Sequence, residues 1–190
     1  MQPTLEDYDV IHALCTHPEV MHFIGDGSLS TPVKTLEKLK KDITHFEKHG
    51  YGFGLVYEKG RGCFVGQAGL FHLEYNDSQP KNEIGYRLHP NSWRKGYATE
   101  LATALKEWGF QHLGVDALYA VVDPRNVNSQ AVVKKAGLIF IKDTRFYNKD
   151  IKLFRRVFIK LCQHKFISAL NLNVHQNKSG AVMLSVPNYA

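Results

Sequence analysis

A strand, a glycine-containing loop and a long helix follow one another from residue 82, and this unit most constrains how the chain folds. Residues 82–88 (NEIGYRL) predict a strand that His89-Pro90 closes. A helix follows, ended by Gly109 and Gly114, with apolar residues at helical spacing at Ala98, Leu101, Ala102, Leu105 and Trp108. A second strand is predicted at 117–122. A strand–helix–strand order of this kind predicts a right-handed parallel crossover.

Two helices are predicted before this unit. A capping box at residues 4–7 opens the first, which His17-Pro18 breaks. Pro32 opens the second, which runs to Gly50 with an apolar stripe at Val33, Leu36, Leu39 or Lys40, Ile43 and Phe46.

Strands dominate the rest of the chain. They are predicted at 51–57 and 63–72, and as antiparallel pairs at 138–142 with 152–161 and at 169–175 with 181–186. Ser129 is expected to cap a short helix that ends at Ala136. This order predicts an α+β domain, in which helices cover both faces of a mixed, mostly antiparallel sheet.

Length and composition limit the classes of protein to which the chain can belong. The chain of 190 residues fits one domain with a sizeable core. It has no apolar run near the roughly 18 residues of a membrane span and no signal peptide at its start. The three cysteines, Cys15, Cys63 and Cys162, are too widely spaced for a disulfide framework or a metal knuckle. We therefore expect a reduced, cytoplasmic protein without a metal.

The net charge of +6 is uneven, because basic residues gather between 134 and 165. Such a region attracts nucleic acid, an acidic substrate or a phosphorylated cofactor, or it is simply a solvated face. No aromatic-basic RNA motif accompanies it, so nucleic acid is not expected as a partner.

The loop NSWRKGYATE (91–100) predicts a phosphate cradle. Gly96 lets the backbone approach a ligand closely, and the free N–H groups at the helix start favour an anion. Arg94 and Lys95 would add full charges, and Thr99 a hydroxyl. The loop is neither GxxxxGK[ST] nor GxGxxG. The alternative is a surface loop before an amphipathic helix.

Four segments together resemble the GCN5-related N-acetyltransferase (GNAT) superfamily, and within it the RimJ/RimL-type branch. They are HPEVMHFIGDG (17–27), YGFGLVYEKGRGCFVGQAGL (51–70), NEIGYRLHPNSWRKGYATELA (82–102) and VVDPRNVNSQAVVKKAGLIF (121–140). The resemblance implies a three-layer fold with a splayed acetyl-CoA cleft, formed by a domain over residues 1–160. The first strand of the family has no counterpart before the first helix. We expect the extension, 161–190, to add a hairpin (169–186) that covers the vacant sheet edge or a partner's edge.

The resemblance also implies the residues that bind acetyl-CoA. The backbone of Leu88, His89 and Pro90 would pair with pantetheine, and the Leu88 N–H would face the thioester carbonyl. Gly96 and Ala98 match the last two fixed positions of the superfamily loop, while Trp93 departs from its first, and Arg94 stands where the branch more often has glycine. The implied acetyl-CoA-binding residues of this loop and of the segment DPRNVNS (123–129) are Arg94, Lys95, Gly96, Tyr97, Ala98, Thr99, Asn126 and Ser129. Asn126 either contacts the cofactor or holds its loop.

Two residues are implied for proton transfer. Glu83 is placed to deprotonate the acceptor amine, and Tyr147 to protonate the CoA thiolate. The alternatives are an exposed strand glutamate and a hairpin-loop aromatic, with His72 or His89 as the base instead. Strand alternation puts Glu83 on the less apolar face, with Gly85 and Arg87.

The sequence thus predicts an N-acetyltransferase that moves an acetyl group from acetyl-CoA directly to a primary amine. The acceptor would be a protein N-terminus or a small amine, such as a polyamine, an amino acid or an aminoglycoside. The competing function is a catalytically inactive module that binds or senses acyl-CoA. We expect no membrane association and a monomer or homodimer.

Overall fold

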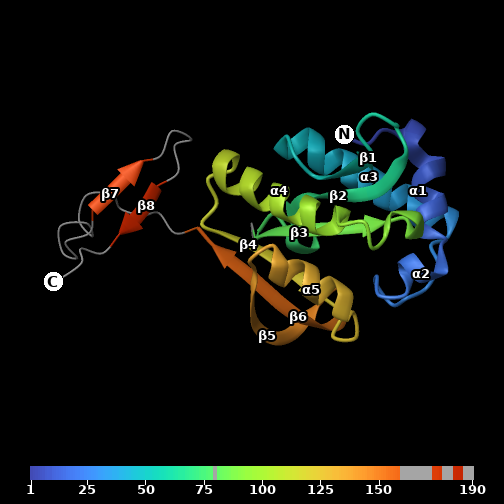
Figure 1. Cartoon of the computed structure of the whole chain (residues 1–190). Coiled ribbons are helices and arrows are strands. Elements are labelled where there is room, and N and C mark those ends of the chain that lie inside the picture. The colour runs from blue at the N-terminus through green and yellow to red at the C-terminus, as the bar shows by residue number, and fades with distance from the viewer. Residues whose placement is uncertain (79–80, 159–172, 177–181, 186–190) are drawn as a thin grey trace. The chain divides into compact units, whose positions relative to one another are not determined.

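The computed structural model describes residues 1–78, 81–158, 173–176 and 182–185. The chain divides into two compact units after residue 158 (Figure 1). Within the described ranges, no helix combines the length and apolarity needed to cross a bilayer.

A six-stranded sheet organises the first unit, in the order β1-β2-β3-β4-β6-β5. Its strands are β1 (Phe53–Tyr57), β2 (Phe64–His72), β3 (Asn82–Leu88), β4 (Ala117–Val122), β5 (Ile139–Phe146) and β6 (Lys149–Val157). β3 and β4 run parallel, and the other neighbouring strands run antiparallel. The predicted crossover and mixed sheet are confirmed. The predicted strand 152–161 is displaced, because β6 already begins at Lys149 and ends at Val157; residues 159–161 lie outside the described ranges.

The α-helices are α1 (Tyr8–Cys15), α2 (Pro18–Met21), α3 (Pro32–His49), α4 (Tyr97–His112) and α5 (Val127–Lys135). Short 3-10 turns are η1 (Leu5–Asp7), η2 (Leu73–Tyr75) and η3 (Pro90–Ser92). Thr31 caps α3 by accepting a hydrogen bond from the Lys34 N–H, and Gly50 ends it with a φ of 76°.

The predicted helix faces needed correction. In α3, Val33 and Leu36 are exposed, whereas the polar side chains of Thr35, Asp42 and His45 are buried beside Leu39. Thr35 and Asp42 find hydrogen-bond partners on other elements, in His12 and Tyr75, which a periodicity pattern does not show.

α4 also differs from its prediction. Its buried residues are Ala102 and Gly109, while Trp108 is exposed. Gly109 does not end the helix but lies inside it, where a Cβ would come within 2.8 Å of Leu70 Cδ1. Glycine therefore lets α4 approach the sheet. The N-cap of α5 is Asn126 rather than Ser129, and its Oδ1 accepts a hydrogen bond from the Ser129 N–H at 3.0 Å.

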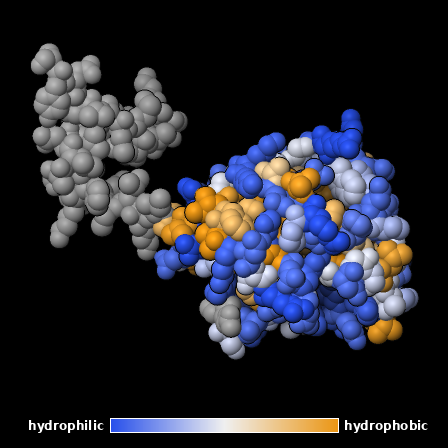
Figure 2. All heavy atoms as spheres, turned by 90° about the horizontal axis from the view of Figure 1, so that it is seen from below, coloured by the Kyte–Doolittle hydropathy of each residue, from blue (hydrophilic) through white to orange (hydrophobic). Residues whose placement is uncertain are grey.

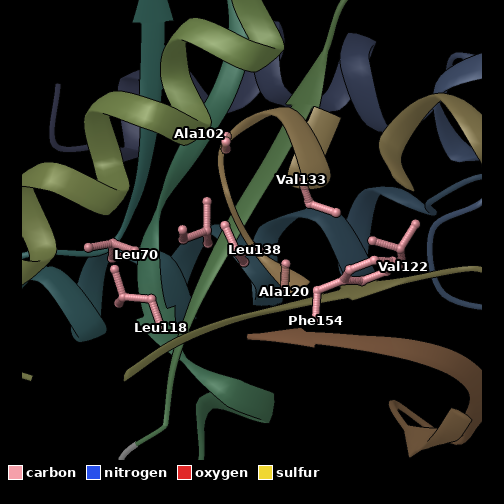
Figure 3. Close-up of a cluster of buried hydrophobic side chains, with 10 residues drawn as sticks. Leu70, Ala102, Leu118, Ala120, Val122, Val133, Leu138 and Phe154 are labelled. Atoms are coloured by element: carbon pink, nitrogen blue, oxygen red, sulfur yellow. The ribbon is translucent and has the colours of Figure 1, made fainter. Parts of the chain in front are cut away.

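Two buried clusters show that helices cover both faces of the sheet. One joins α1, α3 and β1 through Ile11, Cys15, Leu39 and Leu55. The other joins α4 and α5 to β2, β3, β4 and β6; Figure 3 shows Leu70, Ala102, Leu118, Val133 and Phe154 among its side chains. The arrangement is the predicted three-layer fold.

The edge strand β1 is paired by the first residue of the chain. The Met1 amino group donates to the Leu55 carbonyl at 2.8 Å, and the Leu55 N–H donates to the Met1 carbonyl at 2.9 Å. At the opposite edge, β5 exposes Ile139, Phe140 and Ile141. On the face seen in Figure 2, a hydrophobic patch gathers within a mainly hydrophilic surface.

The second unit contains β7 (Asn173–Gln176) and β8 (Val182–Ser185), which pair antiparallel. Most of the expected hairpin 169–186, including its turn, lies outside the described residues, as does Cys162. Its role in covering a sheet edge therefore stays a prediction.

Candidate active site

A gap opens in the sheet between β3 and β4. These strands pair only through Asn82 with Leu118 and Glu83 with Tyr119, so the ladder ends after Glu83. The His89 N–H donates to the Val65 carbonyl on the β2 side at 2.9 Å. Because successive N–H groups of a strand point to opposite edges, the Leu88 and Tyr86 N–H groups face the gap. Sequence reasoning identified the Leu88 donor and missed the one at Tyr86, which the same alternation reveals.

The loop after β3 leads from this gap to the start of α4. The Trp93 indole N–H donates to the Leu88 carbonyl at 2.8 Å and so ties the loop to its own strand. Arg94 adopts a φ of 60° and Gly96 a φ of 88°, both in the left-handed region. Arg94 therefore stands where glycine would be less strained.

The first turn of α4 offers free backbone donors. The Thr99 and Glu100 N–H groups both donate to the Gly96 carbonyl, so neither is free to bind a ligand. The N–H groups of Tyr97 and Ala98 precede the first helical acceptors and remain available. A Cβ on Gly96 would meet no protein atom within 4 Å, so the space beside it is open to a ligand.

Positive charge and a cavity adjoin this turn. Arg94 and Lys95 are exposed. A cavity of about 460 Å³ lies between the loop, the β1–β2 turn and α1, with His89, Lys95, Tyr97, Arg61 and Leu14 in its lining. Free backbone N–H groups, exposed cations and the open space beside Gly96 together suit a ligand that carries phosphate groups.

Glu83 lies at the point where β3 and β4 separate. Its side chain is buried rather than exposed, and burial raises the pKa of the carboxyl to about 8. The Tyr147 hydroxyl donates to Glu83 Oε2 at 2.6 Å. The structure thus brings together the two residues that the sequence predicted for proton transfer, although 64 positions separate them.

Tyr147 is held from a second side by η2. It occupies the β5–β6 turn with a φ of 53°, and its N–H donates to Glu74 Oε1 at 2.7 Å. The Glu74 N–H in turn donates to the Tyr147 hydroxyl at 2.9 Å. Burial and the neighbouring Glu83 carboxyl raise the pKa of the Tyr147 phenol above its ordinary value. Tyr147 is a loop aromatic, but its hydroxyl is fixed to Glu83.

The two alternative histidines lie in other networks. His89 Nδ1 accepts a hydrogen bond from the Asn91 N–H at 3.2 Å and so caps η3. His72 contacts Tyr51 and Asp77. Neither ring is hydrogen-bonded to Glu83 or Tyr147.

The segment after β4 supports the other wall of the gap. Asn126 caps α5, and the Tyr86 hydroxyl reaches from β3 to the Ser129 carbonyl at 3.4 Å. The buried Asp123 carboxylate binds Arg125 at 2.9 Å and Lys149 at 2.7 Å, and these partners hold the pKa of Asp123 well below its usual range. Sequence reasoning missed Asp123, Lys149 and Glu74, because the bonds from Lys149 to Asp123 and from Tyr147 to Glu74 join distant parts of the chain.

Comparison with known proteins identifies this arrangement. The sequence profile described as "Acetyltransferase (GNAT) domain" matches residues 1–139. The uncharacterized protein YkkB of Bacillus subtilis (strain 168) is 29% identical over 155 residues, which cover 80% of this chain and 88% of that protein.

Solved structures share the fold. An acetyltransferase from Agrobacterium tumefaciens str. C58 superposes with a TM-score of 0.70 at 24% identity, covering 82% of this chain and 88% of the other. The spermidine N-acetyltransferase from Vibrio cholerae, solved in complex with CoA and spermine, gives a TM-score of 0.67 at 18% identity, covering 83% and 93%. The profile match spans most of the chain and includes the open gap and the loop with its free N–H groups. This protein therefore belongs to the GNAT family of acetyltransferases, which transfer an acetyl group from acetyl-CoA to an amine.

Proposed function

We propose that the protein acetylates a primary amine by direct attack of that amine on acetyl-CoA, with Glu83 as the general base and Tyr147 as the general acid. The observation that carries this proposal is the 2.6 Å hydrogen bond between these two side chains, at the end of the β3–β4 ladder. A buried carboxyl and a phenol in contact there can take up one proton and deliver another within a single turnover.

Backbone donors along the gap would position the thioester. Tyr86 and Leu88 are three and five residues beyond Glu83, which corresponds to about 10 and 17 Å along an extended strand. Of these two donors the Tyr86 N–H is the nearer to Glu83, so we assign the thioester carbonyl oxygen to Tyr86. The Leu88 N–H, which sequence reasoning gave to the carbonyl, then binds the pantetheine arm.

The start of α4 would bind the CoA phosphates. The N–H groups of Gly96, Tyr97 and Ala98 face a region without side-chain bulk, and the cations of Arg94 and Lys95 border it. Thr99 contributes through its hydroxyl, because its N–H is already bonded to Gly96. Asn126 and Ser129 flank the cofactor arm from α5.

Proton transfer then balances within the pair. The acceptor releases one proton to water to become a neutral amine, which attacks the thioester carbon. As the N–C bond forms and the C–S bond breaks, Glu83 takes a proton from the nitrogen, and Tyr147 gives its hydroxyl proton to the sulfur. The hydrogen bond between the two side chains returns the proton from Glu83 to Tyr147.

The acceptor class rests on the chemistry of a primary amine. A protein N-terminus and a small amine both offer the required nitrogen, and the Vibrio cholerae structure holds spermine. Membership of the RimJ/RimL-type branch, which would favour protein N-termini, stays a prediction. The Glu74 carboxylate, bonded to the Tyr147 N–H, adds a negative charge beside the proposed pair, which favours an acceptor that arrives as a cation.

An acceptor screen tests the function. CoA thiol release is followed with acetyl-CoA and a panel of N-terminal peptides, polyamines, amino acids and aminoglycosides. Release that depends on one acceptor class supports the enzyme, whereas acetyl-CoA binding without release for any acceptor supports the inactive sensing module.

A variant pair then tests the residue roles. With a pKa of about 8, Glu83 is ionised in roughly one tenth of molecules at pH 7, so turnover should rise towards pH 9. Glu83→Gln should lower turnover at least tenfold and remove this rise, while calorimetry still shows acetyl-CoA binding. Glu107→Gln on the exposed face of α4 is the matched control. Unchanged turnover and pH profile in Glu83→Gln would reject the base.

A further inference from the structure

We propose that His45, His49, His72 and Asp77 form a structural binding site for a divalent transition-metal cation, for which Zn²⁺ is the best-suited ion. One ligand atom from each of these four residues lies within 4.8 Å of the others. None of the four side chains is hydrogen-bonded to Glu83 or Tyr147, and the inference does not depend on the proposed function. The sequence analysis expected no metal, since it considered only cysteine spacing.

Three separate elements bring the four side chains together. His45 and His49 are four residues apart on α3, which places them on one face of the helix. His72 ends β2, and Asp77 follows η2. The ring centroids of His45 and His49 are 4.5 Å apart, as are those of His49 and His72, and His45 and His72 are 5.1 Å apart.

The Asp77 carboxylate already faces two of the rings. Its Oδ1 lies 2.7 Å from His72 Nδ1 and 3.1 Å from His49 Nε2. Ligand atoms around tetrahedral zinc, at bonds of about 2.0–2.1 Å, are roughly 3.3 Å apart. The existing contacts are therefore near the required spacing, and rotation of the partly exposed His49 and exposed Asp77 closes the rest.

A second set of hydrogen bonds orients His72 as a ligand. The Tyr51 hydroxyl donates to Asn82 Oδ1 at 2.6 Å, so towards His72 Nε2, at 3.0 Å, it can only accept. This gives Nε2 the role of donor to Tyr51, and a cation that replaced the proton between Nδ1 and Asp77 Oδ1, 2.7 Å apart, would leave that bond in place. A metal-binding histidine whose other nitrogen donates to a polar neighbour is the arrangement found in metal centres.

His45 supplies an independent observation. The residue is 5% exposed, and its Nε2 has no hydrogen-bond partner among the described residues. A buried imidazole nitrogen without a partner is costly, and coordination to a cation would satisfy it. Three imidazoles and one carboxylate are a ligand set that suits zinc.

Lys48 is the group that opposes this site. Its ammonium contacts Asp77 Oδ2, but the Lys48 side chain is 60% exposed and can turn into water. A bound cation would then replace it as the partner of Asp77.

The metal would also fix the segment between two of its ligands. Glu74 and Tyr75 lie between His72 and Asp77 with φ values of 57° and 54°. The Glu74 side chain accepts from Tyr147, and the Tyr75 hydroxyl donates to Asp42 on α3. Anchoring both ends of this strained segment should slow hydrogen exchange over residues 73–77.

Calorimetry with zinc tests the site. The full chain, without a histidine tag and stripped with EDTA, is titrated with ZnCl₂, and we expect one equivalent to bind with submicromolar Kd. His49→Ala and Asp77→Asn should each weaken binding at least tenfold, because each removes one of four ligands. His112→Ala, which removes an exposed histidine near the end of α4, should bind as the native chain does.

Two further measurements separate coordination from incidental binding. Co²⁺ in place of Zn²⁺ should give the intense visible absorption of a tetrahedral site, and Zn²⁺ should protect residues 73–77 from exchange. Circular dichroism checks that each variant is folded. Absence of stoichiometric binding, or equal binding by native, His49→Ala and Asp77→Asn chains, would overturn the proposal.

Discussion

Replacing Glu83 by glutamine should remove a pH dependence from the stability of the folded chain. The carboxyl has a pKa of about 8 in the folded state, against 4.5 for an unperturbed glutamate, because the fold buries it. A tenfold difference in proton affinity corresponds to about 1.4 kcal/mol. Ionising Glu83 within the fold therefore costs about 5 kcal/mol.

The pH window follows from the direction of the shift. Below the unfolded value of 4.5, both states hold the proton and Glu83 contributes no dependence. Between 4.5 and about 8, the unfolded chain is ionised while the folded chain keeps its proton, so stability falls as pH rises. Above about 8, the cost is complete.

A second titrating group, His45, sets the lower limit of the pH range for this measurement. Burial lowers the pKa of His45 to about 4, so this group removes stability only as pH falls below its ordinary value of 6.5. From pH 6.5 to pH 9, Glu83 should therefore lower the free energy of unfolding by about 2 kcal/mol.

Urea denaturation at pH 6.5, 7.5 and 9 measures this effect. The native chain should lose about 2 kcal/mol across the series, whereas Glu83→Gln should lose much less, because glutamine can still accept the Tyr147 hydroxyl. Glu107→Gln, on the exposed face of α4, should follow the native chain. A native chain whose stability is flat over this range, or a Glu83→Gln chain that keeps the native slope, would refute the reasoning.

Three other substitutions test the site. Gly96→Val should abolish acetyl-CoA binding by calorimetry, because the new side chain fills the space beside the α4 donors; retained micromolar affinity would reject the phosphate cradle. Arg94→Gly should raise the free energy of unfolding by about 1 kcal/mol, since it relieves a left-handed φ, yet weaken acetyl-CoA binding through the lost cation; equal affinity would show that Arg94 does not face the ligand. Tyr147→Phe should cut turnover at least tenfold with acetyl-CoA affinity preserved, and native turnover in stopped-flow assays would exclude it as the acid.

Local patterns predicted most of the fold. β3 and β4 have the predicted bounds, because β3 carries an apolar residue at every second position, β4 is a short apolar run, and turn residues follow both. The faces of α3 and α4 were harder to predict. Val33 is exposed and Asp42 is buried, since the partner of Asp42 is Tyr75, a residue far along the chain.

The same reason limited the prediction of the site. Alternation correctly put Glu83 opposite Ile84, but exposure depends on what covers that face, and its burial by distant elements left no local trace. The histidine cluster has a sequence signal in the spacing of His45 and His49. His72 and Asp77 join them only through the fold.

Because the pairing between β3 and β4 is short, the sheet is divided into two parts. The sheet consists of two three-stranded plates, β1-β2-β3 and β4-β6-β5, joined edge to edge at Asn82 and Glu83. Beyond Glu83, no ladder pairing between β3 and β4 fixes the width of the gap. The hydrogen bonds of the Tyr147 hydroxyl with Glu74 and Glu83 connect the two plates beside the gap. Under the proposed role of Tyr147 as the acid, release of CoA and proton transfer would be coupled, because Tyr147 also joins the two plates.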